Sequence, residues 1–126
     1  MSDKKAARVI PIQPAGRSTS SAGALEFHAP LPLSLYVHIP WCVQKCPYCD
    51  FNSHVRETID ETRWRMAYIR ELEYWAEKTA GRRISSVFFG GGTPSLMSPD
   101  TTAAILEAVH RLWPMRNDVE ITLEAN

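Results

Sequence analysis

Segments typical of β-strands alternate with segments typical of α-helices along most of this chain, and no other feature limits its possible folds so strongly. Residues 33–39 and 84–89 are short runs rich in leucine, β-branched and aromatic side chains, and residues 120–124 form a third such run. Longer amphipathic stretches separate these runs. Parallel strands need crossover connections of this kind, so the order strand, helix, strand, helix, strand predicts a parallel sheet and the α/β class.

Capping signals and apolar periodicity predict where the two helices lie. Thr58 and Glu61 have the spacing of a capping box, and Gly81 follows the periodic stretch, so the first helix is expected between them. Its apolar face would carry Trp64, Tyr68, Leu72 and Trp75. Ser98 followed by Pro99 predicts the start of the second helix. The buried stripe expected on that helix consists of Ala104, Ile105, Ala108 and Leu112.

Three chemically distinctive features follow the three predicted strands. A cysteine-rich loop, residues 42–49, comes after the first strand, and a glycine loop, residues 90–93, follows the second. Glu124 stands at the end of the third. Ligands of parallel α/β folds gather at the carboxyl ends of the strands. We therefore expect these features to share one rim of the sheet.

The three cysteines, Cys42, Cys46 and Cys49, leave three kinds of site open. Cys46 and Cys49 alone have the spacing of a glutaredoxin-like dithiol, which gives Cys42 no role. His54 could complete a Cys3His zinc site. An iron–sulfur cluster with one open iron would use all three thiolates, because most such clusters take four ligands. Only this third alternative gives the glycine loop a function, which is to hold whatever occupies the open position.

Composition narrows the class of protein and its compartment. The 126 residues have room for one modest domain, with 44% apolar residues and a formal net charge of zero. That balance predicts no electrostatic binding to nucleic acid or to an anionic membrane. No apolar run approaches the roughly 20 residues of a membrane-spanning helix. An odd number of clustered cysteines is a poor disulfide framework, so we expect a reducing compartment, the cytoplasm.

Residues 1–30 differ from the rest of the chain. They combine basic residues with proline, glycine and a Ser-Thr-Ser-Ser run and lack hydrophobic periodicity. Such a segment buries too little apolar surface to offset the entropy of ordering it. We expect a disordered N-terminal extension over residues 1–30 and one domain from residue 31 to residue 126.

The motifs together resemble a known family. Cys-x3-Cys-x2-Cys, with Tyr48 just before its last cysteine, is similar to the signature of the radical S-adenosylmethionine (radical SAM) superfamily. The strings LYVHIPWC and CDFN around it, GGGTPS at residues 90–95 and Glu-Ala-Asn at residues 124–126 resemble one branch. That branch contains oxygen-independent coproporphyrinogen III oxidases and HemW-like heme chaperones. The resemblance implies a partial (β/α)6 TIM-like barrel, of which this chain would be the N-terminal part, ending within the third strand.

The resemblance also implies a role for individual residues. Cys42, Cys46 and Cys49 would ligate a 4Fe–4S cluster whose fourth iron binds SAM. The residues expected to contact SAM are Tyr36, Tyr48, Gly91, Gly92, Thr93 and Glu124. Glycine suits such a loop because the absent side chain lets the backbone approach a ligand closely.

One position distinguishes the two branches. The oxidase type has a fourth cysteine two residues after the third, and here that position is Phe51. HemW-like relatives share the phenylalanine. The resemblance therefore favours a heme chaperone, with heme or porphyrin and heme-acceptor proteins as partners, over an oxidase that uses SAM to oxidise coproporphyrinogen III.

The expected fold is incomplete over these residues. The third strand has no helix after it, although both faces of a parallel sheet are normally covered. We therefore expect the apolar side chains of Ile121 and Leu123 to be exposed.

Overall fold

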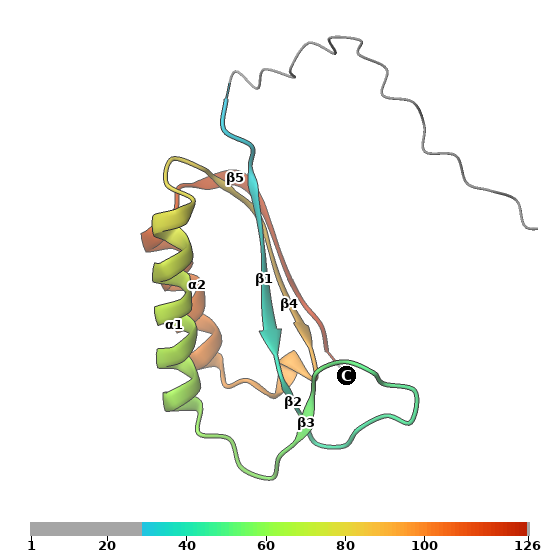
Figure 1. Ribbon diagram of the computed structural model, residues 1–126. Coiled ribbons are helices and arrows are strands. Elements are labelled where there is room, and N and C mark those ends of the chain that lie inside the picture. The colour runs from blue at the N-terminus through green and yellow to red at the C-terminus, as the bar shows by residue number, and fades with distance from the viewer. Residues whose placement is uncertain (1–28, 126) are drawn as a thin grey trace, which may run out of the picture.

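The computed structural model describes residues 29–125, and most of the N-terminal extension expected over residues 1–30 lies outside them. The described chain forms a three-stranded sheet, a small two-stranded sheet and two α-helices (Figure 1). The elements are β1 (Leu33–Ile39), β2 (Trp41–Cys42), β3 (His54–Val55), α1 (Glu61–Lys78), β4 (Ile84–Gly91), the 3-10 helix η1 (Pro94–Leu96), α2 (Pro99–Leu112) and β5 (Met115–Leu123).

The larger sheet has the order β1-β4-β5, and both of its pairings are parallel. Leu35 stands opposite Val87, and Val87 stands opposite Ile121. Helices α1 and α2 connect successive strands and lie side by side on one face of the sheet (Figure 1). The predicted parallel α/β fold is therefore confirmed.

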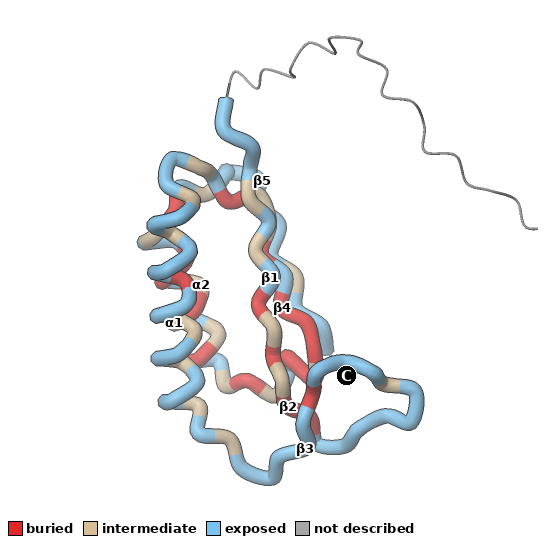
Figure 2. Tube along the Cα trace, viewed as in Figure 1, coloured by how far each residue is buried: buried red, intermediate tan, exposed pale blue. Residues whose placement is uncertain are grey.

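The core lies between this sheet face and the two helices. Ile39 from β1, Phe89 from β4 and Ile105 and Val109 from α2 are completely buried, and α1 contributes Leu72. Burial is greatest along β4, the central strand, whereas the cysteine-rich loop is mostly exposed (Figure 2). The core thus fixes the strands, and the strands hold the loops that follow them.

The capping box predicted for α1 is wrong. Asp60, rather than Thr58, caps the helix, because its carboxylate accepts the backbone N–H of Arg63 at 3.0 Å. Glu61 is consequently the first helical residue and cannot reach back as a capping-box glutamate would.

Glu61 instead joins the two helices. Its carboxylate accepts hydrogen bonds from the Ser98 backbone N–H, the Ser98 hydroxyl and the Thr101 hydroxyl. Partial burial by itself would raise the pKa of Glu61. The hydrogen bonds from Thr101 and Ser98, with the charge of Arg65, outweigh it and lower the pKa below 4.5. The N-termini of α1 and α2 are therefore tied together by one ionised side chain.

The second helix and the third strand agree with the sequence in part. Ser98 caps α2 and Pro99 is its first residue, as predicted. Ile105 and Ala108 are buried, but Ala104 and Leu112 are only half-buried. The third strand begins at Met115, five residues before its predicted start. Residues 116–118 are polar and exposed, so no apolar alternation marks this half of the strand in the sequence.

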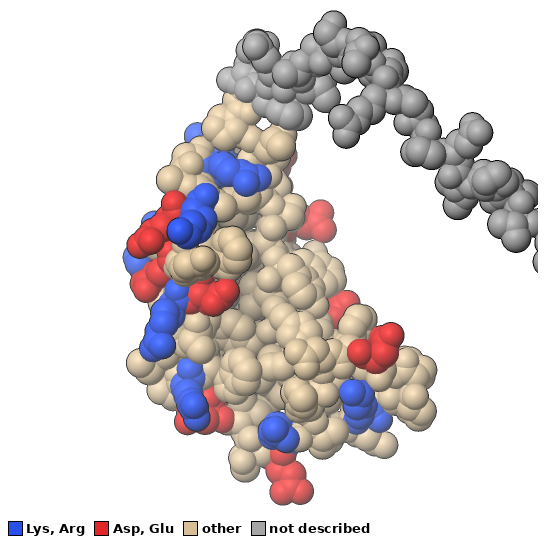
Figure 3. All heavy atoms as spheres, in the orientation of Figure 1, with Lys and Arg blue, Asp and Glu red and all other residues tan. Residues whose placement is uncertain are grey.

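Three further observations concern the surface and the helices. Ile121 and Leu123 keep 48% and 38% of their area exposed, as expected of a strand without a covering helix. Lysine, arginine, aspartate and glutamate side chains are interspersed along the helical side of the molecule (Figure 3). None of the helices between residues 29 and 125 is both long and apolar enough to span a membrane.

Candidate functional site

The three features that follow the strands lie at one end of the sheet. The cysteine-rich loop leaves β1, the glycine loop ends β4, and Glu124 follows β5 (Figure 1). The backbone N–H of Glu124 donates to the carbonyl of Phe89 at 3.1 Å, which fixes the end of β5 beside the start of the glycine loop. The expected common rim is therefore present.

A short parallel pairing closes the base of the cysteine loop. Trp41 stands opposite His54, and Cys42 stands opposite Val55. The His54 N–H donates to the Pro40 carbonyl at 2.6 Å, and the Cys42 carbonyl accepts the Arg56 N–H at 3.1 Å. Residues 43–53 consequently project from the rim as one closed loop (Figure 1).

The three thiols occupy different environments within this loop. Cys42 is buried at the base, Cys49 is half-buried, and Cys46 is exposed. A turn joins the last two, with the Cys49 N–H donating to the Cys46 carbonyl at 3.0 Å. Within residues 29–125 no three histidine, cysteine, aspartate or glutamate side chains are arranged to share a metal ion. Sequence proximity alone therefore does not bring the three thiols to one point.

The glycine loop packs directly against the base of the cysteine loop. The N–H of Gly92 donates to the Ile39 carbonyl at 2.6 Å, and the N–H of Thr93 donates to the Trp41 carbonyl at 2.9 Å. A Cβ atom on Gly92 would lie 2.5 Å from the Trp41 carbonyl oxygen and 2.9 Å from Cys42 Sγ. Only glycine fits this contact, because real Cβ atoms do not approach other atoms so closely.

Gly91 is required for a second reason. Its φ of +110° lies in the region that L side chains rarely adopt. A Cβ atom there would also lie 2.7 Å from the Ile39 carbonyl oxygen and 2.8 Å from the His38 ring. The absent side chains at Gly91 and Gly92 thus let β4 end against β1 and the first cysteine.

Hydrogen bonds from the side chain of His38 on β1 hold the C-terminal end of the cysteine-rich loop. His38 Nε2 lies 2.8 Å from the Asn52 carbonyl oxygen, and His38 Nδ1 lies 3.3 Å from the Tyr36 hydroxyl. The geometry fits a tautomer in which Nε2–H donates to Asn52 and the Tyr36 hydroxyl donates to Nδ1. The sequence did not single out Asn52 for this contact, because only the folded loop brings residue 52 back to residue 38.

Tyr36 lies on the sheet face opposite the helices. Its ring stacks with Phe88 at a centroid distance of 6.0 Å, and 55% of its area is exposed. The same ring covers Gly90, where a Cβ atom would lie 2.9 Å from Tyr36 Cε2. The Tyr36 ring therefore covers the last residues of β4 on the sheet face that carries no helices.

The remaining predicted site residues differ in exposure. Thr93 is buried beside the cysteine loop, whereas Glu124 is exposed at the end of β5. Tyr48 is 88% exposed at the tip of the loop. A hydrogen bond to Cys46, followed by the charge of Cys46, raises the pKa of Tyr48. The structure brings Thr93, Gly92 and Cys42 together and leaves Tyr48 apart from them.

Comparison with known proteins gives close relatives for this part of the chain. It is 46% identical over 96 residues to "Heme chaperone HemW" of Escherichia coli (strain K12), covering 75% of this chain and 25% of the relative. It is 47% identical over 93 residues to "Radical S-adenosyl methionine domain-containing protein 1, mitochondrial" of Bos taurus, covering 74% and 21%. The chain thus spans about a quarter of the length of these relatives.

A solved structure shares the fold. The chain is similar, with a TM-score of 0.70 and 32% sequence identity, to the structure titled "Coproporphyrinogen III oxidase (HemN) from Escherichia coli is a Radical SAM enzyme". The similarity covers 75% of this chain and 22% of that one. The sheet and helices described above therefore match the N-terminal part of a radical SAM TIM-like barrel.

The family match includes the whole candidate site. The Radical SAM superfamily matches residues 36–126, a span that contains all three cysteines, the glycine loop and Glu124. The family implies a 4Fe–4S cluster and SAM. The donor set fits this implication, because three free thiols lie in one loop and the buried one contacts the glycine loop. The chain belongs to the radical SAM superfamily.

Proposed function

We propose that the protein containing these residues is a radical SAM heme chaperone. The observation that carries the proposal is the packing of the buried Cys42 against Gly92, because a cluster ligand at Cys42 would then lie beside a backbone loop able to receive SAM. The 46% identity to a protein named as a heme chaperone supports the same assignment. Phe51, at the position where the oxidase branch has a further cysteine, also favours it.

Cys42, Cys46 and Cys49 would hold the 4Fe–4S cluster, and the cluster supplies electron transfer to SAM when both are bound. Because Cys46 is exposed, Cys49 is only half-buried and neither belongs to the core, both would move toward Cys42 without disturbing it. Cys42 is fixed by the β2–β3 pairing and by Gly92, so it would set the position of the cluster.

SAM would be bound by residues at the rim and at the tip of the cysteine-rich loop. Those at the rim are Tyr36, Gly91, Gly92, Thr93 and Glu124, and the one at the tip is Tyr48. The glycine loop would bring backbone groups toward the ligand. Tyr36 would limit access of water from the open sheet face, since its ring already covers Gly90.

Heme or a related porphyrin would be the cargo, and heme-acceptor proteins would be the partners. A reducing compartment such as the cytoplasm suits the three free thiols, which would otherwise be open to oxidation.

A second candidate function is anaerobic oxidation of coproporphyrinogen III. It is favoured by the shared fold with the solved oxidase, at 32% identity. The two functions make different use of the same site. An oxidase must turn over a porphyrinogen, whereas a chaperone must bind heme and release it to another protein.

The deciding experiment uses the full-length protein with a reconstituted cluster. It is incubated anaerobically with reductant, SAM and coproporphyrinogen III, and separately titrated with heme followed by absorption spectroscopy. We expect a stoichiometric heme complex and no decarboxylated product. Product formation together with no heme binding would reject the chaperone and support the oxidase.

A further inference from the structure

The hydroxyl of Ser53, near the end of the cysteine-rich loop, is a buried polar group that faces one of the three thiols. Ser53 keeps only 4% of its area exposed, and its Oγ lies 3.9 Å from the Sγ of Cys49. Among residues 29–125 no other side-chain or backbone group forms a hydrogen bond with this hydroxyl. Buried hydroxyl groups normally have a hydrogen-bond partner. In this fold the partner of Ser53 is therefore Cys49.

The position of Ser53 is fixed by its two neighbours along the chain. The Asn52 carbonyl oxygen lies 2.8 Å from His38 Nε2, and the His54 N–H donates to the Pro40 carbonyl at 2.6 Å. Contacts on both sides thus hold Ser53 against the end of β1. The hydroxyl is consequently placed by the sheet and not by the exposed part of the loop.

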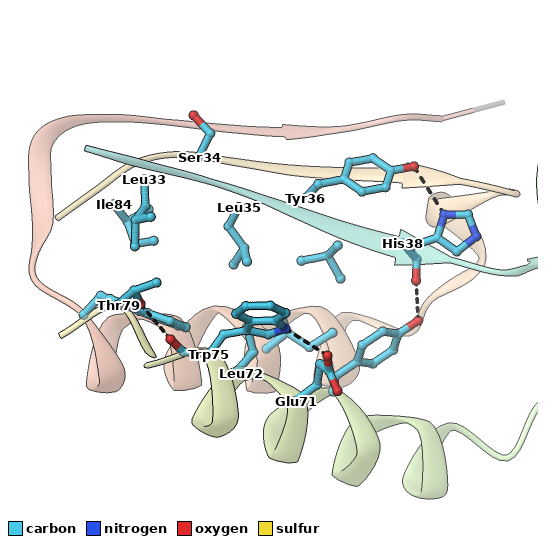
Figure 4. Close-up of a pocket in the computed structure, with 14 residues that line it drawn as sticks. Leu33, Ser34, Leu35, Tyr36, His38, Glu71, Leu72, Trp75, Thr79 and Ile84 are labelled. Carbon is cyan, nitrogen blue, oxygen red and sulfur yellow. Dashed lines mark hydrogen bonds between the residues drawn. The ribbon is translucent and has the colours of Figure 1, made fainter. Parts of the chain in front are cut away.

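His38, which holds Asn52, is held in turn from two sides. Its Nδ1 lies 3.3 Å from the Tyr36 hydroxyl, and its carbonyl accepts the Tyr68 hydroxyl at 2.8 Å (Figure 4). Tyr68 belongs to α1 and packs against the hydrophobic core. A chain of hydrogen bonds therefore connects the helical layer with the segment that carries Ser53.

Ser53 lies at the base of the loop, where the first cysteine is also fixed. It comes directly before β3, and Cys42 is the last residue of β2, the parallel partner of β3. Ser53 and Cys42 are thus held by the same pair of short strands. A Cys49 side chain that approaches Cys42 remains at this base, beside Ser53.

With Cys49 as a cluster ligand, as proposed above, we infer that the Ser53 hydroxyl donates a hydrogen bond to the Cys49 thiolate and thereby raises the reduction potential of the cluster. The charge of the acceptor decides the direction of the bond. A thiolate has no proton, so the hydroxyl must be the donor. A hydrogen bond to a charged acceptor is also stronger than one to a neutral thiol.

This bond affects the two oxidation states of the cluster unequally. Reduction adds one electron from an external reductant, and part of the added negative charge falls on the ligand sulfurs. A donor at a ligand sulfur therefore stabilises the reduced state more than the oxidised state, and hydrogen bonds to the sulfurs are among the factors that set cluster potentials. No covalent bond breaks, and the hydroxyl proton stays on Ser53.

The test compares Ser53→Ala with wild type in the full-length protein carrying a reconstituted cluster. Titration with dithionite, without SAM, is followed by the electron paramagnetic resonance of the reduced cluster. At a fixed applied potential the ratio of reduced to oxidised cluster should fall about threefold to tenfold in Ser53→Ala. For a one-electron couple this is a shift of about 30–60 mV to lower potential. The iron content should stay that of wild type, because Ser53 is not a ligand.

A matched serine separates this effect from a general loss of stability. Ser85 is half-buried at the opposite end of β4 from the glycine loop, and its hydroxyl donates to the Leu33 carbonyl at 3.0 Å. Ser85→Ala also loses one hydrogen bond from a serine. It should lower the stability of the protein in chemical denaturation and leave the cluster potential unchanged.

A second measurement observes the proton itself. Electron–nuclear double resonance of the reduced cluster, recorded in H2O and in D2O, should show one exchangeable proton in wild type that Ser53→Ala lacks. Equal potentials or equal exchangeable protons in the two proteins would overturn the inference and leave the proposed cluster intact. Loss of iron in Ser53→Ala, or the same shift in Ser85→Ala, would overturn it as well.

These outcomes are distinct from those that test the proposed function. A wild-type protein that assembles no iron–sulfur cluster would reject the ligand set and the Ser53 bond together. Failure of the protein to bind heme would reject the chaperone assignment alone, because the cluster potential is measured without heme.

Discussion

A Cβ atom on Gly92 would lie 2.9 Å from Cys42 Sγ, so the glycine loop and the first cysteine of the candidate cluster site are in direct contact. The same atom would lie 2.5 Å from the Trp41 carbonyl oxygen. Two loops separated by about fifty residues of sequence therefore share one packed junction. The position of Cys42 depends on the absence of a side chain at Gly92.

Gly92→Ala should disturb this junction. The added methyl group meets backbone as well as sulfur, and overpacking of this kind costs about 1–3 kcal/mol. We expect lower stability in chemical denaturation and less iron bound after reconstitution.

Gly81→Ala is the matched control for that experiment. Gly81 has a φ of +81°, but a Cβ atom there would meet nothing within 4 Å. The Gly81→Ala variant should lose about 1 kcal/mol of folding stability through backbone strain and keep the iron content of wild type. Wild-type iron content and stability in Gly92→Ala would show that the junction does not position Cys42.

The cysteines can be tested one at a time. Cys42→Ala, Cys46→Ala and Cys49→Ala should each remove the cluster, because an open 4Fe–4S cluster with three thiolates cannot spare one. Iron analysis and the visible absorption of the anaerobically reconstituted protein provide the measurement, with about four irons per chain expected for wild type.

The two alternatives from the sequence predict different results. A Cys3His zinc site would give a colourless protein with one zinc that is lost in His54→Ala. In the structure the His54 ring is exposed and bonded to Asn52 Oδ1. A dithiol would keep its redox activity in Cys42→Ala. Either result would contradict the cluster.

The hydrogen-bonded carboxylate of Glu61 predicts a dependence of stability on pH. Because its pKa is lowered in the folded protein, its stabilisation is fully present above the ordinary value of 4.5 and is lost as pH falls through the folded value. We expect Glu61→Gln to be less stable than wild type by about 1–2 kcal/mol near pH 7, with the difference shrinking as the pH falls below 4.5 and the carboxylate becomes protonated.

Denaturation curves of the cluster-free protein at several pH values check this dependence. Glu73→Gln serves as the control, because Glu73 pairs with Arg111 at 3.5 Å on the surface and both side chains are more than half exposed. A difference between wild type and Glu61→Gln that stays constant with pH would exclude the ionised carboxylate as its source.

Tyr68 offers a test of how α1 supports the rim. Its hydroxyl donates to the His38 carbonyl at 2.8 Å, and burial raises its pKa, so it remains a neutral donor. Tyr68→Phe leaves that carbonyl without this partner and should cost about 1–2 kcal/mol. Denaturation should show no comparable loss for Tyr74→Phe, since Tyr74 is 51% exposed on the same helix. Equal losses of stability in the two variants would show that the effect comes from changing a tyrosine on α1 and not from the hydrogen bond to the His38 carbonyl.

Local signals in the sequence sufficed for much of the fold. Strand β1 and the start of α2 coincide with their predicted bounds, because alternation and the Ser98 cap act within a few residues. The start of α1 was missed, since Asp60 is an equally good cap and Glu61, which a capping box would use, bonds instead to Ser98 and Thr101 at the start of α2. The first half of β5 was missed because its polar residues carry no apolar alternation.

The groups available for chemistry can be read from the sequence: three thiols in one loop, glycines after the second strand and an acid after the third. Which of these groups meet depends on how the elements pack. Gly92 contacts Cys42, and His38 holds Asn52. The physical reason is range. Propensities and caps depend on neighbours along the chain, whereas these contacts depend on the register and crossing of elements that lie far apart in it.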